Sequence, residues 1–230
     1  MLAVILAAGK GKRLKEITKD MPKCLIEIGG KSIIERQIEI LNKNGINEIY
    51  VVVGYKANEI MKKLNGKVNF ILNEDYEKTD NLYSLYLAKN FVKGREFILL
   101  NGDAIFDEEI IKQIIMKDGN RIPVDKKHYD KEELKIKGDE IAEKILPKSA
   151  AREESDGSTI GIFKFSPDGS KILFDEIEGL VEKGMKNRWF EYAINKILDK
   201  TKFYIEDISN YNWMEIDTMQ DLKKAREIWK

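Results

Sequence analysis

A continuous apolar run at the N-terminus, Leu2–Ala7, ends at two glycines and three basic residues, Gly9-Lys10-Gly11-Lys12-Arg13. A strand that is apolar at every position is typical of a sheet buried on both faces. The same alternation continues with strand patterns at 48–53, 68–72 and 96–100 and helical patterns at 32–43, 57–64 and 82–90. Strands separated by helices of this length indicate βαβ units. The sequence therefore predicts an α/β fold with a mainly parallel sheet.

The second half of the chain is less regular. It predicts short strands at 122–124, 134–136, 160–165 and 203–207, a polar loop at 149–158, and helices at 171–183, 189–198 and 218–229. Thr218 is a plausible N-cap of the last helix. Because no linker or repeat interrupts the chain, we expect one domain over 1–230, with a core of about 1–120 and a smaller lobe and closing elements at about 121–230.

The charge balance and the apolar runs exclude several partners. The chain has 230 residues, and its 40 basic and 40 acidic side chains cancel, which argues against nucleic acid or an anionic membrane as a partner of the whole protein. No run of about 18 apolar residues is present, so we expect no membrane insertion. The N-terminal apolar run is too short for a signal peptide, and we expect a cytoplasmic protein.

The scarcity of cysteine and histidine limits the available chemistry. Cys24 and His128 are the only residues of their types. An internal disulfide, a cysteine zinc cluster and a two-histidine metalloprotease site are excluded, and a catalytic triad is disfavoured. Asp, Glu, Lys, Arg and backbone amides remain, and this set suits phosphoryl or nucleotidyl transfer with a hard metal ion.

The glycine-rich loop after the first strand is the first candidate site. Its small residues allow a ligand to approach the backbone, its amides can point at phosphates, and Lys12 and Arg13 add positive charge. A dinucleotide-binding fingerprint would require glycine where Leu14 stands. Gly30-Lys31-Ser32 is not a Walker A loop, because Leu25 occupies the position of its first glycine, so we interpret it as a turn into a helix.

Three further motifs carry charge. Pro22-Lys23 presents one lysine that can supply a point charge to an α-phosphate, although most such dipeptides are surface turns. Asp103 follows the strand at 96–100, where a carboxylate is well placed to hold Mg²⁺ but can equally be a turn or capping residue. Asp217 precedes the last helix and can either cap it or join Asp103 in clamping a metal ion.

Taken in order, these motifs resemble a known family. Leu6-Ala7-Ala8-Gly9-x-Gly11-x-Arg13-Leu14, Pro22-Lys23, Gly102-Asp103 and Glu215-Ile216-Asp217-Thr218 are similar to the signature of the sugar-phosphate and phosphoalcohol nucleotidyltransferases, over residues 1 to about 230. The chain looks most like the small CTP-using members, the phosphocholine, 2-aminoethylphosphonate and inositol-1-phosphate cytidylyltransferases. The features that carry this likeness are Pro22-Lys23-Cys24-Leu25-Ile26-Glu27, Asn81-Leu82-Tyr83-Ser84-Leu85 and Trp189-Phe190-Glu191-Tyr192-Ala193.

The resemblance implies a fold and an activity. The fold is the three-layer α/β/α nucleotide-diphospho-sugar transferase fold, with a Rossmann-like, mainly parallel mixed sheet and a small acceptor-binding lobe. The activity is Mg²⁺-dependent transfer of CMP from CTP to a small phosphorylated alcohol or phosphonate, with release of pyrophosphate. The sequence does not define the oligomeric state, and a homodimer is one candidate.

The resemblance also implies residue roles. Gly9, Gly11, Lys12 and Arg13 would bind the triphosphate, and Arg13 would neutralise charge on the leaving pyrophosphate. Ala8 and Gly102 are also expected to bind the nucleotide. Lys23 would contact the transferred phosphate, and Asp103 and Asp217 would hold Mg²⁺, so Arg13, Lys23 and Asp103 are the expected catalytic residues. The residues expected around the base and ribose are Leu6, Ala7, Asn81 and Ser84.

Acceptor contacts are expected from the second half of the chain. The candidates are Lys126, Lys148, Glu191, Tyr192 and Trp213. A trimethylammonium or ammonium head group favours aromatic faces and a carboxylate. The residues that can supply them are Trp189, Phe190, Glu191, Tyr192 and Trp213. The alternative is that Trp189 and Tyr192 belong to the core and that Lys126 lies in a solvated turn.

Two other functions remain open. The first is a sugar-1-phosphate nucleotidyltransferase that uses UTP, dTTP or GTP. The second is a non-catalytic nucleotide-sensing subunit of the same fold, which would be expected to have lost some of the charges that Arg13, Lys23, Asp103 and Asp217 retain.

Overall fold

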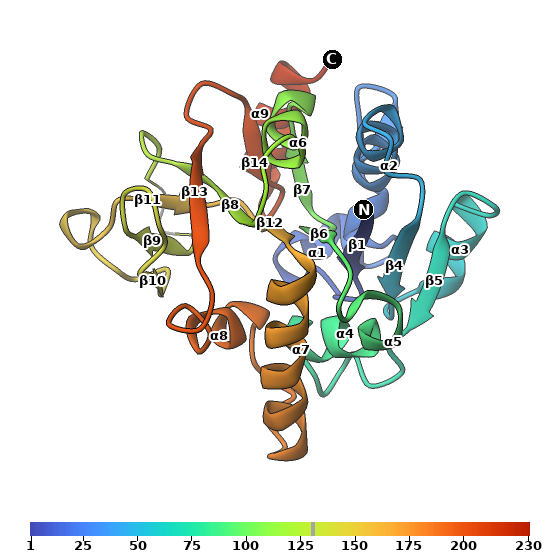
Figure 1. The fold of residues 1–230 in the computed structure, drawn as a ribbon. Helices are drawn as coiled ribbons and strands as arrows, with labels where there is room; N and C mark the ends of the chain where they lie inside the picture. Colours follow the sequence, from blue (N-terminus) through green and yellow to red (C-terminus); the bar gives the residue numbers. More distant parts are fainter. Residues whose placement is uncertain (130–131) are drawn as a thin grey trace.

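A ten-stranded mixed sheet forms the centre of the protein (Figure 1). The computed structural model describes residues 1–129 and 132–230, and for Lys12, Lys15 and Glu16 it describes the backbone alone. The sheet order is β10-β9-β11-β8-β12-β6-β1-β4-β5, with β13 beside β8. The strands are β1 (Leu2–Ala7), β4 (Ile49–Val53), β5 (Asn69–Leu72), β6 (Phe97–Asn101), β8 (Asn120–Asp125), β9 (Lys135–Lys137), β10 (Lys144–Leu146), β11 (Gly157–Thr159), β12 (Ile162–Phe165) and β13 (Phe203–Asp207).

The predicted α/β fold is confirmed. Strands β5, β4, β1 and β6 are parallel neighbours, and β12 adds to β6 in the antiparallel direction. Two short strand pairs lie outside the sheet: β2 (Glu27–Ile28) with β3 (Lys31–Ser32), and β7 (Ala104–Phe106) with β14 (Trp213–Glu215). The helices are α1 (Lys15–Thr18), α2 (Ile33–Lys43), α3 (Ala57–Lys63), α4 (Asn81–Leu87), α5 (Lys89–Val92), α6 (Glu108–Ile115), α7 (Pro167–Glu182), α8 (Phe190–Asn195) and α9 (Met219–Ile228), with 3-10 turns η1 (Lys12–Leu14), η2 (Lys23–Leu25) and η3 (Arg152–Glu154).

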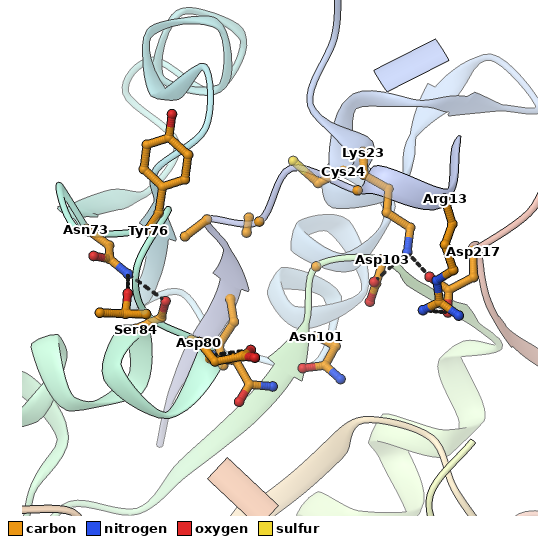
Figure 2. Close-up of a pocket in the computed structure, with 18 residues that line it drawn as sticks. Arg13, Lys23, Cys24, Asn73, Tyr76, Asp80, Ser84, Asn101, Asp103 and Asp217 are labelled. Atoms are coloured by element: carbon orange, nitrogen blue, oxygen red, sulfur yellow. Dashed lines mark hydrogen bonds and ion pairs between the residues drawn. The ribbon is translucent and has the colours of Figure 1, made fainter. Parts of the chain in front are cut away.

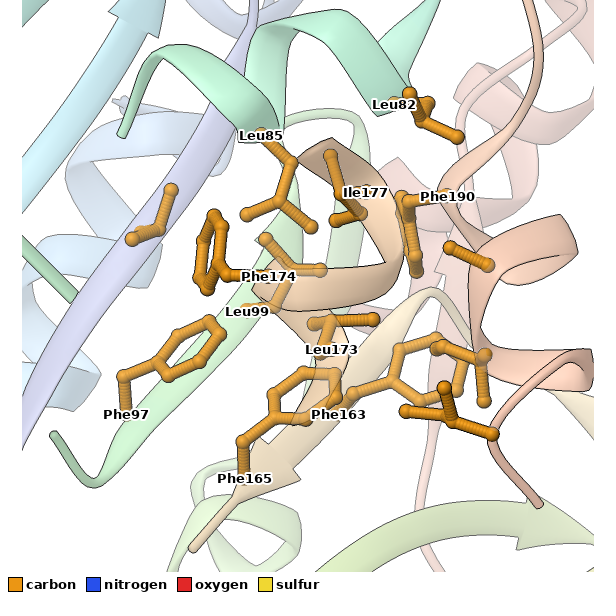
Figure 3. Close-up of a cluster of buried hydrophobic side chains, with 14 of the residues drawn as sticks. Leu82, Leu85, Phe97, Leu99, Phe163, Phe165, Leu173, Phe174, Ile177 and Phe190 are labelled. Atoms are coloured by element: carbon orange, nitrogen blue, oxygen red, sulfur yellow. The ribbon is translucent and has the colours of Figure 1, made fainter. Parts of the chain in front are cut away.

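Successive side chains of β1 point to opposite faces of the sheet, and all of them are apolar. Helices therefore cover both faces. Leu2, Val4 and Leu6 pack in the cluster that includes α4, α7 and α8, part of which Figure 3 shows. Ala3 and Ile5 pack on the other face, with residues of α2, α3 and α6. Burial of each large apolar side chain contributes roughly 1.5–3 kcal/mol, so a strand with two buried faces is the most strongly anchored element of such a sheet.

A third, smaller cluster connects the C-terminus to the loop between β1 and α2. Leu222 and Ala225 of α9 pack against Leu14, Ile26 and other residues of that loop. The helix begins at the predicted N-cap, because the Thr218 hydroxyl accepts the Asp221 N–H in a capping box. This packing holds the segment with the Pro22-Lys23 motif in place.

Local expectations differ from the structure at two places and agree with it at a third. The helix expected at 82–90 divides into α4 and α5 at Ala88. Gly157 and Ser158, expected in a polar loop, lie in β11, because β8 and β9 pair with this segment from both sides. Gly30-Lys31-Ser32 is a turn into a helix, as interpreted, with Ser32 as the N-cap of α2. No helix among the described residues has the length and apolar character needed to cross a bilayer.

Candidate active site

The glycine-rich loop turns sharply where β1 leaves the sheet. Gly11 has a φ of +60°, and its carbonyl accepts hydrogen bonds from the Leu14 N–H at 3.1 Å and the Thr18 hydroxyl at 2.9 Å. A Cβ added at Gly11 would come within 3.1 Å of the Lys23 Cβ, whereas one added at Gly9 would meet nothing within 4 Å. Glycine at 11 therefore permits both the left-handed turn and the close approach to Lys23.

A second glycine brings the turn after β6 against the end of β1. The Gly102 N–H donates to the Leu6 carbonyl at 2.9 Å, and a Cβ at Gly102 would lie 2.7 Å from that oxygen. On the other side of the turn, the Ile216 N–H donates to the Asp103 carbonyl at 3.0 Å. These two backbone contacts place Asp103 and Asp217 at the same edge of the sheet although they are distant in sequence.

Lys23 lies between these two carboxylates (Figure 2). Its ammonium is 2.7 Å from Asp103 Oδ2 and forms a second ion pair with Asp217 Oδ1. Arg13 Nη2 contacts the other oxygen of Asp217 at 2.5 Å, and Arg13 Nη1 contacts Glu132. Four of the five charged residues predicted for the nucleotide and metal sites thus form one network: Arg13, Lys23, Asp103 and Asp217.

Charge within this network is balanced despite burial. Burial by itself would lower the pKa of Lys23, but the Asp103 and Asp217 carboxylates outweigh it and raise that pKa. Burial would likewise raise the pKa of Asp103, and the Lys23 ammonium lowers it instead. Lys23 is therefore a cation and Asp103 an anion throughout the neutral range.

A cavity of about 320 Å³ opens beside this network (Figure 2). The predicted nucleotide-site residues that line it are Leu6, Ala7, Ala8, Gly9, Gly11, Arg13, Lys23, Asn81, Ser84 and Gly102. Asp103 and Asp217 line it as well. The prediction for the Lys12 side chain falls outside what the structure describes.

Sequence analysis missed several residues of this cavity. They are Cys24, Asn73, Tyr76, Thr79, Asp80 and Asn101. Asn73 follows β5 at the sheet edge, which was the available signal for it; its amide Nδ2 donates to Thr79 at 3.2 Å and Ser84 at 3.0 Å. Its Oδ1 is buried with no hydrogen-bond partner among the described residues. Burial raises the pKa of the Cys24 thiol to about 12, so it stays protonated.

A second cavity of about 270 Å³ adjoins the first. The two share the lining residues Arg13, Asp80, Asn81, Asn101, Asp103 and Asp217. Of the predicted acceptor residues, Lys148 and Glu191 line this second cavity, together with Leu134, Thr159, Gly161, Trp189 and Glu215. Asn81 joins its walls, because its side-chain oxygen accepts the Phe190 N–H at the start of α8 at 2.8 Å.

The other three predicted acceptor residues do not line this cavity. The Lys126 ammonium pairs with Asp139 at 2.7 Å, as the solvated-turn alternative expected. The ring of Tyr192 is partly exposed and lies beside Lys196. Trp213 faces a different hollow and donates its indole N–H to Asp125 at 2.9 Å. Lys126 follows the end of β8, Tyr192 lies on α8 and Trp213 on β14, and residue type alone does not indicate which way each side chain faces.

Two carboxyl groups in the second cavity, those of Glu191 and Glu215, have raised pKa values. Burial raises the pKa of Glu191 to about 8, and the neighbouring Glu215 carboxylate adds to the effect. Burial also raises the pKa of Glu215 to about 7, with a further contribution from Asp103. This end of the cavity therefore has more carboxyl groups than nearby cations.

Comparisons with known proteins agree with this geometry. A family model described as a MobA-like NTP transferase domain matches residues 3–145. The CTP:phosphoglutamine cytidylyltransferase of Campylobacter jejuni is 32% identical over 97% of this chain and 98% of that protein. The choline-phosphate cytidylyltransferase of Streptococcus pneumoniae is 30% identical over 100% of this chain and 99% of that protein. The chain belongs to the MobA-like NTP transferase family.

The solved structure of the inositol-1-phosphate CTP transferase from T. maritima superposes on this NTP transferase with a TM-score of 0.81. The two are 25% identical, over 99% of this chain and 94% of that one. The predicted family and the predicted enzyme class, a nucleotidyltransferase, are therefore confirmed.

Enzymes of this NTP transferase family generally use a divalent metal ion. Asp103 and Asp217 fit such an ion, because both direct a carboxylate oxygen at one point that the Lys23 ammonium reaches. No group of three or more His, Cys, Asp or Glu side chains in the described residues is arranged to hold a metal. Mg²⁺ is usually bound by one or two carboxylates, and substrate phosphates and water supply its other ligands.

Proposed function

We propose that this protein is a Mg²⁺-dependent cytidylyltransferase that transfers CMP from CTP to a small phosphorylated alcohol or phosphonate and releases pyrophosphate. The observation that carries the proposal is the pair of adjoining cavities, which share Arg13, Asp103 and Asp217. One cavity begins at the glycine-rich loop, and the other leads away toward α8. Two substrates bound in them would meet at the shared charged residues.

Asn73 supports a cytosine base in the first cavity. Its Oδ1 is a buried acceptor without a partner among the described residues, and such an atom favours a ligand that supplies an N–H. The exocyclic amine of cytosine supplies one, whereas uracil and thymine have a carbonyl oxygen at that position. The names of the relatives from Campylobacter jejuni and Streptococcus pneumoniae point to the same donor.

The chemistry requires positioning and charge neutralisation. A phosphate or phosphonate oxygen of the acceptor is already ionised near neutral pH, so no general base is needed. It forms a bond to the α-phosphorus of CTP while the bond from that phosphorus to the bridging oxygen breaks, and pyrophosphate leaves. Lys23 would stabilise charge on the transferred phosphoryl group, and Arg13 would stabilise charge on the leaving pyrophosphate.

Asp103 and Asp217 would hold Mg²⁺, which neutralises phosphate charge when bound. For either carboxylate to take a metal ion, the Lys23 ammonium has to give up part of its contact with it, and an incoming phosphate offers that ammonium a new partner. Preorganised cations in a partly buried site are worth more than in water, so each of these residues is expected to affect kcat strongly.

An NTP panel tests the proposal. Purified protein is given CTP, UTP, dTTP, GTP or ATP with Mg²⁺ and a set of phosphorylated acceptors, and pyrophosphate release is measured. We expect turnover with CTP and a loss of at least about 100-fold in kcat for Asp103→Ala. Preference for UTP, dTTP or GTP with a sugar 1-phosphate would replace the proposed activity, and unchanged release by Asp103→Ala would refute the role of this carboxylate.

A further inference from the structure

Glu191 is a buried carboxyl group that directs an oxygen without a partner into the second cavity. It is the second residue of α8, its side chain lines the cavity, and 6% of the residue is exposed. Its Oε2 has no hydrogen-bond partner among the described residues. A buried polar atom left without a partner is costly, so its presence in a cavity points to a ligand that completes it.

The charges around Glu191 specify the sign of that ligand. The described lining residues carry five carboxyl groups, Asp80, Asp103, Glu191, Glu215 and Asp217, against two cations, Arg13 and Lys148. Arg13 is paired with Asp217. The Lys148 ammonium donates to the backbone carbonyl of Glu132 and lies 5.8 Å from the centre of the Trp189 ring. Lys23 and Arg13 already pair with Asp103 and Asp217. Asp80, Glu191 and Glu215 then remain against Lys148 among the described lining residues, so a cationic ligand group would complement this end of the cavity.

The number of aromatic side chains in the cavity favours a primary over a quaternary ammonium group. Trp189 is the single aromatic side chain among the described residues that line it. A quaternary ammonium is recognised by several aromatic faces and has no N–H to donate. A primary ammonium carries three N–H donors and can satisfy Glu191 Oε2 directly.

We infer that the acceptor is a short phosphate or phosphonate monoester with a primary ammonium group, which Glu191 binds through Oε2. This inference rests on the proposed function. The phosphate end lies at Asp103 and Asp217, which line the same cavity, and the ammonium end lies at Glu191 and Trp189. Glu215 lines this cavity as well.

An acceptor series separates the possible head groups. Pyrophosphate release from CTP and Mg²⁺ is measured with three groups of acceptors. Phosphoethanolamine, 2-aminoethylphosphonate and phosphoserine carry a primary ammonium, and phosphocholine carries a quaternary ammonium. Glycerol 3-phosphate and inositol 1-phosphate carry hydroxyl groups in place of an ammonium. We expect the highest kcat/KM from a primary amine. Equal or higher kcat/KM with phosphocholine or a hydroxyl acceptor overturns the inference and leaves the cytidylyltransferase standing. No release with any acceptor and any NTP refutes the proposed function itself.

A single substitution tests the role of Glu191. Glu191→Gln keeps the size of the side chain and removes its ability to ionise opposite a bound ammonium, and we expect the KM for the primary-amine acceptor to rise about 100-fold. The KM for CTP is expected to change by less than about threefold, which also shows that the variant is folded. Glu182→Gln, on the exposed end of α7, is the matched control and should behave as the unaltered enzyme. An unchanged acceptor KM in Glu191→Gln would rule out this contact.

Discussion

Lys23 and Asp217 form one of the more buried ion pairs of this charge-rich protein. Lys23 and Asp217 are 9% and 6% exposed, whereas Lys31 and Glu39 form a pair on the open surface. Exposed pairs contribute about 0–1 kcal/mol, and partly buried ones interact through less water. The sequence indicated Lys23 through its place after the glycine-rich loop, but its contact with both aspartates is a product of folding.

At the residue scale, Glu191 makes stability depend on pH. Its pKa is about 8 in the folded protein and about 4.5 when unfolded, so the folded state retains a proton that the unfolded state loses. The contribution of this group to stability is therefore largest below pH 4.5, falls as pH rises toward 8, and is lost above 8, a change of roughly 5 kcal/mol.

Glu191→Gln should remove that pH dependence. The variant and the unaltered protein are expected to unfold at similar temperatures at pH 5, and the variant should be more stable by several degrees at pH 8.5. Thermal unfolding at both pH values measures this, with Glu182→Gln as the control. A variant that is equally destabilised at both pH values would contradict the raised pKa.

At the element scale, the site depends on how closely the turn after β6 approaches the end of β1. Continuous apolar runs in the sequence predicted β1 and β6, since each strand is apolar at nearly every position. Strands β7 and β14 are only three residues each, too short for a pattern to predict them, yet their antiparallel pairing brings Asp103 close to Asp217. Short pairings between distant segments depend on the rest of the fold, so a local pattern cannot reveal them.

Replacing Gly102 tests whether the close contact between the turn after β6 and the end of β1 is needed. Gly102→Ala would place a Cβ 2.7 Å from the Leu6 carbonyl oxygen, and the backbone would have to shift. We expect a loss of about 1–3 kcal/mol in the free energy of unfolding and reduced activity, because Asp103 moves with the turn. Gly179→Ala is the control: its Cβ meets nothing within 4 Å inside α7, so a gain of about 0.5–1 kcal/mol is expected. Denaturant unfolding measures both changes, and equal effects would show that the turn has room for a side chain.

At the scale of the whole molecule, one sheet includes strands from both the N-terminal and the C-terminal halves, and the cavities lie where those halves meet. Lys23 and Gly102 belong to the first half, and Glu191 and Asp217 to the second. A ligand in these cavities contacts segments separated by most of the chain. Its binding is therefore coupled to the stability of the entire fold.

Substrate binding should stabilise the protein as a unit. At a CTP–Mg²⁺ concentration of about 100 times Kd, we expect about 2.7 kcal/mol of stabilisation and a rise in Tm of roughly 5–10 °C. Removal of the metal with a chelator, or the substitution Asp103→Ala, should abolish most of the rise. An equal shift for CTP with and without Mg²⁺ would mean that these carboxylates do not hold the metal ion.

The sequence by itself determined the α/β class, the central strands, the cap of the last helix and the family, because these depend on local periodicity and on motifs contiguous in the chain. It also indicated most of the first cavity, since its loops follow strand ends that share one edge of a parallel sheet. Only the tertiary structure decided that Lys148 and Glu191 line the second cavity while Lys126, Tyr192 and Trp213 do not. The reason is physical: which side chain faces a cavity, and whether its charge has a partner there, depends on packing between distant segments.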